Sequence, residues 1–90
     1  MQELFIDTRT VEDEAGTHYR FDYYVLIGEI DAGDFFCESY GIKIAQRNAA
    51  NACSIENITT SAARIDSLLE LLLAHRVTPC GLGDVIADWL

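Results

Sequence analysis

Residues 18–27 read HYRFDYYVLI and alternate between two sets of side chains. The odd-numbered set is aromatic or aliphatic throughout: Tyr19, Phe21, Tyr23, Val25 and Ile27. The even-numbered set starts polar and ends apolar: His18, Arg20, Asp22, Tyr24 and Leu26. Successive side chains of a strand point to opposite faces, so this alternation predicts a β-strand with one apolar face. We expect this strand at the centre of a sheet.

Three further stretches around it also predict strands. They are residues 4–11, 35–44 and 53–58, with turns expected at 14–16, 31–34 and 48–51. Because every connection is short, consecutive strands are expected to pair as an antiparallel meander. Gly41, inside the segment 35–44, predicts a β-bulge.

The residues after the last strand predict a helix. Thr59 or Thr60 is its expected N-cap, and it runs to about His75. Its apolar side chains share one face of a helical wheel: Ala62, Ile65, Leu68, Leu69, Leu72 and Leu73. Leu71 lies outside this face, so we expect it to be exposed or covered by another surface.

Thr78 and Pro79 predict a second helix, with Thr78 as N-cap and Pro79 at the first helical position. Its apolar side chains again share one stripe: Leu82, Val85, Ile86, Trp89 and Leu90. The predicted fold is α+β. A four-stranded antiparallel meander in residues 1–58 is followed by two C-terminal helices in residues 59–90, which pack on one sheet face.

Length and charge limit the possible functions. The chain has 90 residues, a length that predicts one domain over residues 1–90. Fifteen acidic and six basic residues give a net charge of -9, which disfavours binding to nucleic acid or to a membrane surface. Ten of the acidic residues lie in residues 1–45, so the negative charge belongs mainly to the first half.

Cys37, Cys53 and Cys80 predict a reducing compartment, because their spacing is not that of a disulfide framework or a zinc site. The N-terminal residues lack the pattern of a signal peptide, and the apolar stretch at residues 68–73 is too short to cross a bilayer. We therefore expect a cytoplasmic protein without a cofactor or a membrane contact.

Few residues form candidate catalytic or metal-binding groups. Cys80, at the start of the last predicted helix, could pair with His75 as a nucleophile, although a structural cysteine is commoner. Asp84 and Asp88 lie one helical turn apart, the spacing of an acid–base pair but also of a solvated helix face. Residues 12–14 resemble the start of a calcium loop but lack its later ligands. We assign no catalytic, cofactor-binding or metal-ligating residue.

Short motifs in the second half resemble those of one family. They are Tyr40-Gly41-Ile42, Ile58-Thr59, Val77-Thr78-Pro79 and DVIADWL at residues 84–90. Together they resemble the pattern of a small family of uncharacterised bacterial proteins, a domain of unknown function found in anaerobic Gram-positive bacteria. The resemblance covers residues 40–90. It implies a cytoplasmic single-domain protein, and no catalytic residue can be carried over from it.

The second and third predicted strands carry large apolar groups on both sides. Tyr24 and Leu26 face away from Tyr23 and Val25, whereas a sheet with one solvated face alternates more cleanly. A second copy of the chain is the simplest cover for the extra face. We therefore expect a homodimer through the sheet face or its edge.

The expected function is that of a small non-enzymatic protein-interaction or regulatory module, which meets its partner through the acidic strands or through exposed groups such as Leu71. Two alternatives stay open. One is a small enzyme or ligand-binding protein with an aromatic pocket formed by Tyr19, Tyr23, Tyr40 and Trp89. The other is an acidic inhibitor that mimics nucleic acid.

Overall fold

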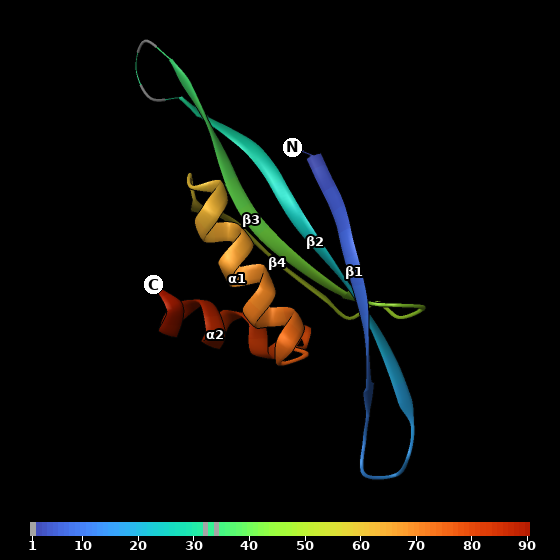
Figure 1. Cartoon of the computed structure of the whole chain (residues 1–90). Helices are drawn as coiled ribbons and strands as arrows, with labels where there is room; N and C mark the ends of the chain where they lie inside the picture. Colours follow the sequence, from blue (N-terminus) through green and yellow to red (C-terminus); the bar gives the residue numbers. More distant parts are fainter. Residues whose placement is uncertain (1, 32, 34) are drawn as a thin grey trace.

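The sheet and the helices follow the predicted order. The computed structural model describes residues 2–31, 33 and 35–90, so Ala32 and Asp34 of the expected turn lie outside the described residues. The elements are β1 (Gln2–Glu12), β2 (His18–Asp31), β3 (Phe36–Gln46), β4 (Ala52–Thr59), α1 (Ala62–Ala74), the 3-10 turn η1 (Pro79–Gly81) and α2 (Leu82–Trp89). All three strand pairs are antiparallel, in the order β1-β2-β3-β4. The predicted α+β meander with two C-terminal helices is confirmed (Figure 1).

β2 is a central strand, as its alternation predicts, and its odd-numbered side chains form part of the core. Phe21, Tyr23 and Val25 are buried with Ile42 and Ile44 of β3 against the helices. The helices contribute the rest of the buried cluster: Ile65, Leu68, Leu69, Leu72, Leu82 and Ile86. Both helices therefore cover one face of the sheet, and we call the other the helix-free face (Figure 1).

The bulge predicted at Gly41 is present, but its extra residues belong to β4. Tyr40 lies opposite Thr59, and Ile42 lies opposite Ile55. Between these two pairs β4 advances by four residues, whereas β3 advances by two. The β4 backbone approaches Gly41 so closely that an added Cβ would lie 2.8 Å from the Cα of Glu56. Only glycine leaves room for β4 at this point.

The N-cap of the first helix lies two residues after Thr59 and one after Thr60. Ser61 is its N-cap, because its side chain accepts a hydrogen bond from the backbone N–H of Arg64 at 3.2 Å. Thr59 instead accepts a hydrogen bond from the N–H of Ser61 at 3.1 Å. The predicted core face is correct except for Ala62, which is exposed at the first turn.

The second helical segment starts at Pro79, as predicted, but its first turn is the 3-10 turn η1 and α2 follows from Leu82. Thr78 occupies the N-cap position without a capping side-chain hydrogen bond. The Tyr23 hydroxyl donates to the carbonyl of Val77 at 2.7 Å and so connects the sheet to the segment between the helices. Burial raises the pKa of the Tyr23 phenol. Leu90, predicted on the apolar stripe, is 73% exposed.

The molecule is elongated, with extents of 55 × 25 × 17 Å and a radius of gyration of 14.0 Å. A compact chain of this length would have a radius of gyration of about 12 Å. The difference arises because the β1–β2 hairpin and the β2–β3 hairpin extend past the helices at opposite ends of the sheet (Figure 1). Among the described residues, no helix combines the length and the apolar character needed to cross a membrane.

Candidate functional site

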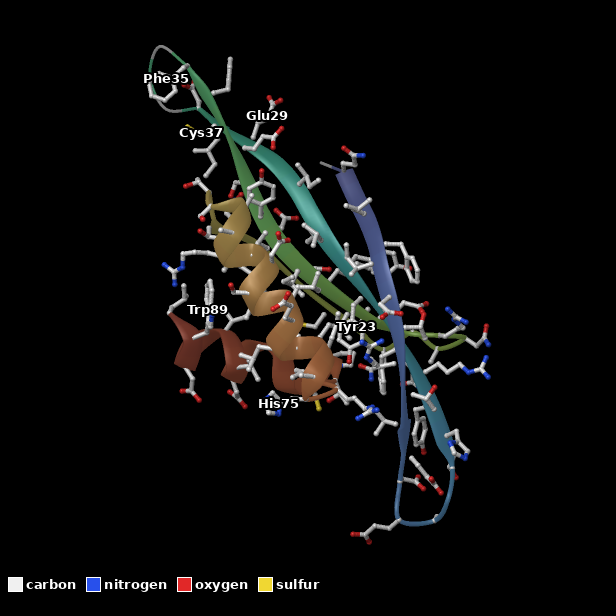
Figure 2. All side chains as sticks on the ribbon, viewed as in Figure 1. Tyr23, Glu29, Phe35, Cys37, His75 and Trp89 are labelled. Carbon is white, nitrogen blue, oxygen red and sulfur yellow. The ribbon has the colours of Figure 1, made fainter. Side chains whose placement is uncertain are left out.

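One end of the sheet is a two-stranded extension, which we call the β2–β3 arm: residues 28–31 and 35–39. β1 starts at Gln2, opposite Ile27, and β4 ends at Thr59, opposite Tyr40, so the arm extends beyond both outer strands. Large apolar side chains are exposed on it, with Ile30 at 38%, Phe35 at 62% and Phe36 at 72% (Figure 2). Exposed apolar groups gathered in one place are typical of an interaction surface.

The β2–β3 arm is also acidic. It carries Glu29, Asp31 and Glu38, and residues 28–39 of the sequence contain no lysine or arginine. Glu29 lies directly opposite Glu38 in the β2–β3 pairing, an arrangement of like charges that destabilises the ribbon. The Tyr40 hydroxyl donates to the Glu38 carboxylate at 2.8 Å, which raises the pKa of the Tyr40 phenol.

A second candidate surface is an apolar groove between the two helices, which we call the helix groove. Its volume is about 350 Å³, and it is lined by Leu71, His75, Val77, Val85, Asp88 and Trp89. Leu71 is exposed, as predicted, and reaches this groove from α1. The Arg64 guanidinium stacks 4.4 Å from the centre of the Trp89 ring, so a cation lies next to the lining aromatic group.

The helix-free face is partly covered by its own charged side chains. Lys43 forms an ion pair with Glu3 at 2.6 Å and lies 5.2 Å from the centre of the Tyr24 ring. The edge of the Phe5 ring packs against Tyr24 with a centroid separation of 5.7 Å. Leu26 is only 4% exposed although it belongs to this face. Long polar side chains thus shield part of the apolar surface that led us to expect a covering partner.

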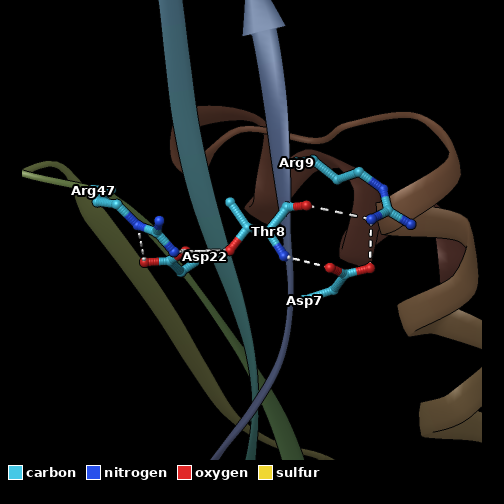
Figure 3. A network of polar contacts seen from close by, with 5 residues as sticks. All are labelled: Asp7, Thr8, Arg9, Asp22 and Arg47. Carbon is cyan, nitrogen blue, oxygen red and sulfur yellow. Dashed lines mark hydrogen bonds and ion pairs between the residues drawn. The ribbon is translucent and has the colours of Figure 1, made fainter.

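A polar network extends the helix-free face toward the β3–β4 turn (Figure 3). Arg47 donates to the Asp22 carboxylate at 2.7 Å and to the Thr8 hydroxyl at 3.0 Å. The Arg47 hydrogen bond lowers the pKa of Asp22, and the Thr8 hydrogen bond acts in the same direction while burial opposes both. On β1, Arg9 pairs with Asp7, and the Thr8 N–H donates to Asp7 at 2.7 Å. The contacts of Arg47 connect β1 and β2 to the turn after β3, whereas the contacts of Asp7 lie within β1.

The acidic segment 12–14 forms part of a turn. Asp13 accepts hydrogen bonds from the N–H groups of Ala15 and Thr17, both at 2.9 Å, and from the Tyr19 hydroxyl at 3.0 Å. These bonds, led by that from Thr17, lower the pKa of Asp13. Asp13 therefore organises the β1–β2 turn, in which Gly16 has a φ of 83°.

The candidate nucleophile and the other cysteines lie in separate elements. Cys80 is exposed in η1 rather than in the first turn of an α-helix, and its Sγ is 3.8 Å from the Thr78 hydroxyl. His75, the C-cap of α1, lines the helix groove. Cys37 belongs to β3 and Cys53 to β4. Within residues 2–31, 33 and 35–90, no cluster of three or more His, Cys, Asp or Glu side chains is placed to hold a metal ion.

The four aromatic residues of the predicted pocket do not share one cavity. Tyr19 lines a hollow of about 320 Å³ with His18, Arg20, Gln46, Arg47 and Asn48. Tyr23 is fully buried and Tyr40 is hydrogen-bonded to Glu38, while Trp89 lines the helix groove. Along the sheet, Tyr19 lies on one side of Tyr23 and Tyr40 lies on the other.

The family model that matches this sequence is that of a family of unknown function, DUF6514, and the match covers residues 2–90. This chain belongs to the DUF6514 family. The match extends the resemblance seen in residues 40–90 to almost the whole sequence. No curated protein and no solved structure matches the DUF6514 chain.

The sequence pattern predicted the exposure of Leu71 in this DUF6514 chain, but neither the β2–β3 arm nor the helix groove as a surface. Phe35 and Phe36 begin the predicted strand 35–44, and the sequence pattern does not show that this end of the strand extends past the helices. Their position immediately after a glycine-containing turn and among acidic residues was the available signal. No pattern in the sequence indicates that Arg64 stacks on Trp89, because the two residues are 25 positions apart and belong to different helices.

Proposed function

We propose that this chain is a non-enzymatic protein-interaction module that works as a homodimer. The observation that carries the proposal is the exposure of large apolar side chains on strands that extend past the helices. Phe35 and Phe36 are exposed on the β2–β3 arm, and Leu4 and Phe5 are 46% and 51% exposed on β1. A chain of this size gains stability when a partner removes such groups from water.

The expected affinity follows from the phenylalanines. Full burial of Phe35 and Phe36 in both copies would contribute roughly 6–12 kcal/mol in total. A micromolar dissociation constant corresponds to about 8 kcal/mol, and association itself costs several kcal/mol. These phenylalanines reach a micromolar dissociation constant only at the upper end of this range, so we expect a dimer no tighter than micromolar, which forms and separates readily.

β1 offers one route to this dimer. It is the outer strand of an open sheet, so one side of its backbone has no neighbouring strand in the described sheet. Leu4 lies opposite Val25 and faces the helix side, whereas Phe5 lies opposite Tyr24 and faces the other side. An outer strand with apolar groups on both faces favours pairing with another strand, and the extra residue Ile6 in its register limits how far such pairing can extend.

The three free thiols and the negative charge fit a protein that acts in the reducing cytoplasm, and we propose that location. The separation of Tyr19, Tyr23, Tyr40 and Trp89 into different surroundings favours the interaction module over the aromatic-pocket alternative. We give priority to self-association because it needs no second gene product.

Light scattering coupled to size-exclusion chromatography tests the proposal. Over loading concentrations from about 1 to about 200 µM, the mass should rise from one chain toward two. An oxidised sample must be compared with one kept in reducing agent, because Cys80 is exposed and could join two chains covalently. A mass of one chain at every concentration, in both samples, would exclude the homodimer.

A further inference from the structure

We infer that two copies exchange their β2–β3 arms, so that Phe36 of each copy enters the helix groove of the other. This inference rests on the proposed homodimer and names the surfaces that form it. Phe36, 72% exposed, is the apolar projection, and the helix groove is the apolar recess. The groove volume of about 350 Å³ falls in the lower part of the range of protein ligand pockets, about 300–1,000 Å³. It is large enough for an aromatic side chain.

Two arginines beside the helix groove favour an acidic occupant, and the β2–β3 arm of a second copy is acidic. Arg64 stacks on Trp89 at one end of α1, and Arg76 follows the lining residue His75 at the other end. Among the described residues, no carboxylate forms an ion pair with Arg64 or Arg76, whereas Arg9, Lys43 and Arg47 each have one. The β2–β3 arm presents only acidic groups around its phenylalanines. Asp88 is the one acidic group that lines the groove itself.

The cross-strand pair Glu29 and Glu38 supports the same arrangement. Like charges directly opposite each other destabilise an isolated ribbon, and a cation placed near them removes the repulsion. The Tyr40 hydroxyl supplies one hydrogen bond to Glu38 but no positive charge. An arginine beside the partner's groove supplies that charge once the arm is docked.

The topology places both surfaces on the same side of the sheet. Phe36, Tyr40 and Ile42 occupy alternate positions of β3, and Ile42 is buried against the helices. The Phe36 side chain therefore lies on the helix side, and it belongs to the part of β3 that extends beyond β4. Two elongated copies related by a two-fold axis can each place an arm over the other's helices. Such an exchange uses both arms and both grooves, so it closes at two chains.

The test uses three single variants of the full chain, compared by light scattering and native mass spectrometry. Phe36→Ser removes the projection, and Leu71→Asp adds a negative charge in the groove at a side chain that is 36% exposed. Phe5→Ser removes an exposed phenylalanine from β1 and so tests the β1 route, which arm exchange does not use. Circular dichroism and urea unfolding must show that each variant folds, and Leu71→Ser replaces Leu71→Asp if the latter does not.

We expect Phe36→Ser and Leu71→Asp each to weaken the dimer roughly a hundredfold, because each change damages both of the exchanged contacts. Phe5→Ser should leave the dissociation constant within about threefold of the original. An equimolar mixture of Phe36→Ser and Leu71→Asp should form a mixed dimer that is tighter than either variant's own dimer. In that pair one intact arm meets one intact groove, and the other contact is already lost.

The possible results separate the two proposals. If Phe5→Ser dissociates the dimer and the other two variants do not, arm exchange is wrong and the homodimer forms through β1. If both arm and groove variants weaken the dimer but the mixture gains nothing, reciprocal exchange is also wrong. A monomeric wild-type chain would overturn the homodimer and the arm exchange together.

Discussion

Gly41 is the residue at which the smallest possible change should have the largest effect. A methyl group there would overlap the backbone of β4, which cannot move without breaking the β3–β4 pairing. We expect Gly41→Ala to lower the free energy of unfolding by about 2 kcal/mol or more, measured by urea denaturation.

Gly83 in α2 is the control for this substitution, because an added Cβ there meets nothing within 4 Å. Gly83→Ala should raise the free energy of unfolding by about 0.5–1 kcal/mol, since alanine restricts the unfolded chain and favours the helix. Equal losses for the two variants would show that close approach of β4 is not the reason that position 41 needs glycine.

Asp22 should make the free energy of unfolding depend on pH in the acidic range. Its pKa in the folded protein lies below the ordinary value of 3.8 because Arg47 and Thr8 donate hydrogen bonds to it. A lowered folded pKa stabilises the protein above pH 3.8, and this contribution is lost as the pH falls from 3.8 through the folded value. At about pH 7, Asp22→Asn should therefore be less stable than wild type by about 1 kcal/mol or less.

The measurement is the urea midpoint as a function of pH for wild type and Asp22→Asn. The two curves should converge below pH 3.8, where Asp22 itself becomes protonated. A constant difference between wild type and Asp22→Asn at every pH would mean that the ion pair contributes nothing.

The start of α1 distinguishes two neighbouring hydroxyl residues. Ser61→Ala removes the side chain that accepts from the N–H of Arg64 and should cost about 1 kcal/mol. Thr60→Ala alters an exposed residue just before the cap and should change stability by less than about 0.5 kcal/mol. Thermal unfolding of both variants decides between them, and a larger loss for Thr60→Ala would place the N-cap where the sequence suggested it.

At the scale of elements, alternation and helical periodicity were enough to predict the strands, their meander and both helices. Helix starts were harder, because Thr59, Thr60 and Ser61 are all good N-caps by type and only the path of β4 decides which hydroxyl faces the first turn. The bulge at Gly41 was predicted correctly, but the sequence does not indicate that its extra residues belong to β4. Glycine marks a close approach of backbone, but the sequence does not show which partner carries the irregularity.

The candidate surfaces depend on how the elements end relative to one another, which local patterns do not encode. β1 and β4 stop before the β2–β3 hairpin does, and this difference in length exposes Phe35 and Phe36. Likewise, Leu71 could be predicted as exposed from the helical wheel, but the groove it lines requires the angle at which α2 crosses α1. Both features belong to the whole molecule rather than to a motif.

The elongated shape predicts a gradient of stability along the sheet. Amides of β2 and β3 beneath the helices, near Tyr23 and Ile42, are expected to exchange with solvent only on global unfolding. Amides of residues 28–31 and 36–39 should exchange much faster in dilute solution, because two strands without a covering layer are marginally stable. Hydrogen exchange followed by mass spectrometry measures both rates. Uniform protection along β2 in a dilute monomer would contradict this gradient.

A ribosome makes the strands of this protein before it makes the helices that cover them. Tyr23, Ile42 and Ile44, which are fully shielded in the finished fold, emerge in a nascent chain that has not yet synthesised Leu68 or Leu82. The Tyr23 hydroxyl finds its acceptor only when Val77 has left the exit tunnel. During translation the apolar face of the sheet therefore stays exposed to water until α1 and α2 have emerged, and the fold closes only then.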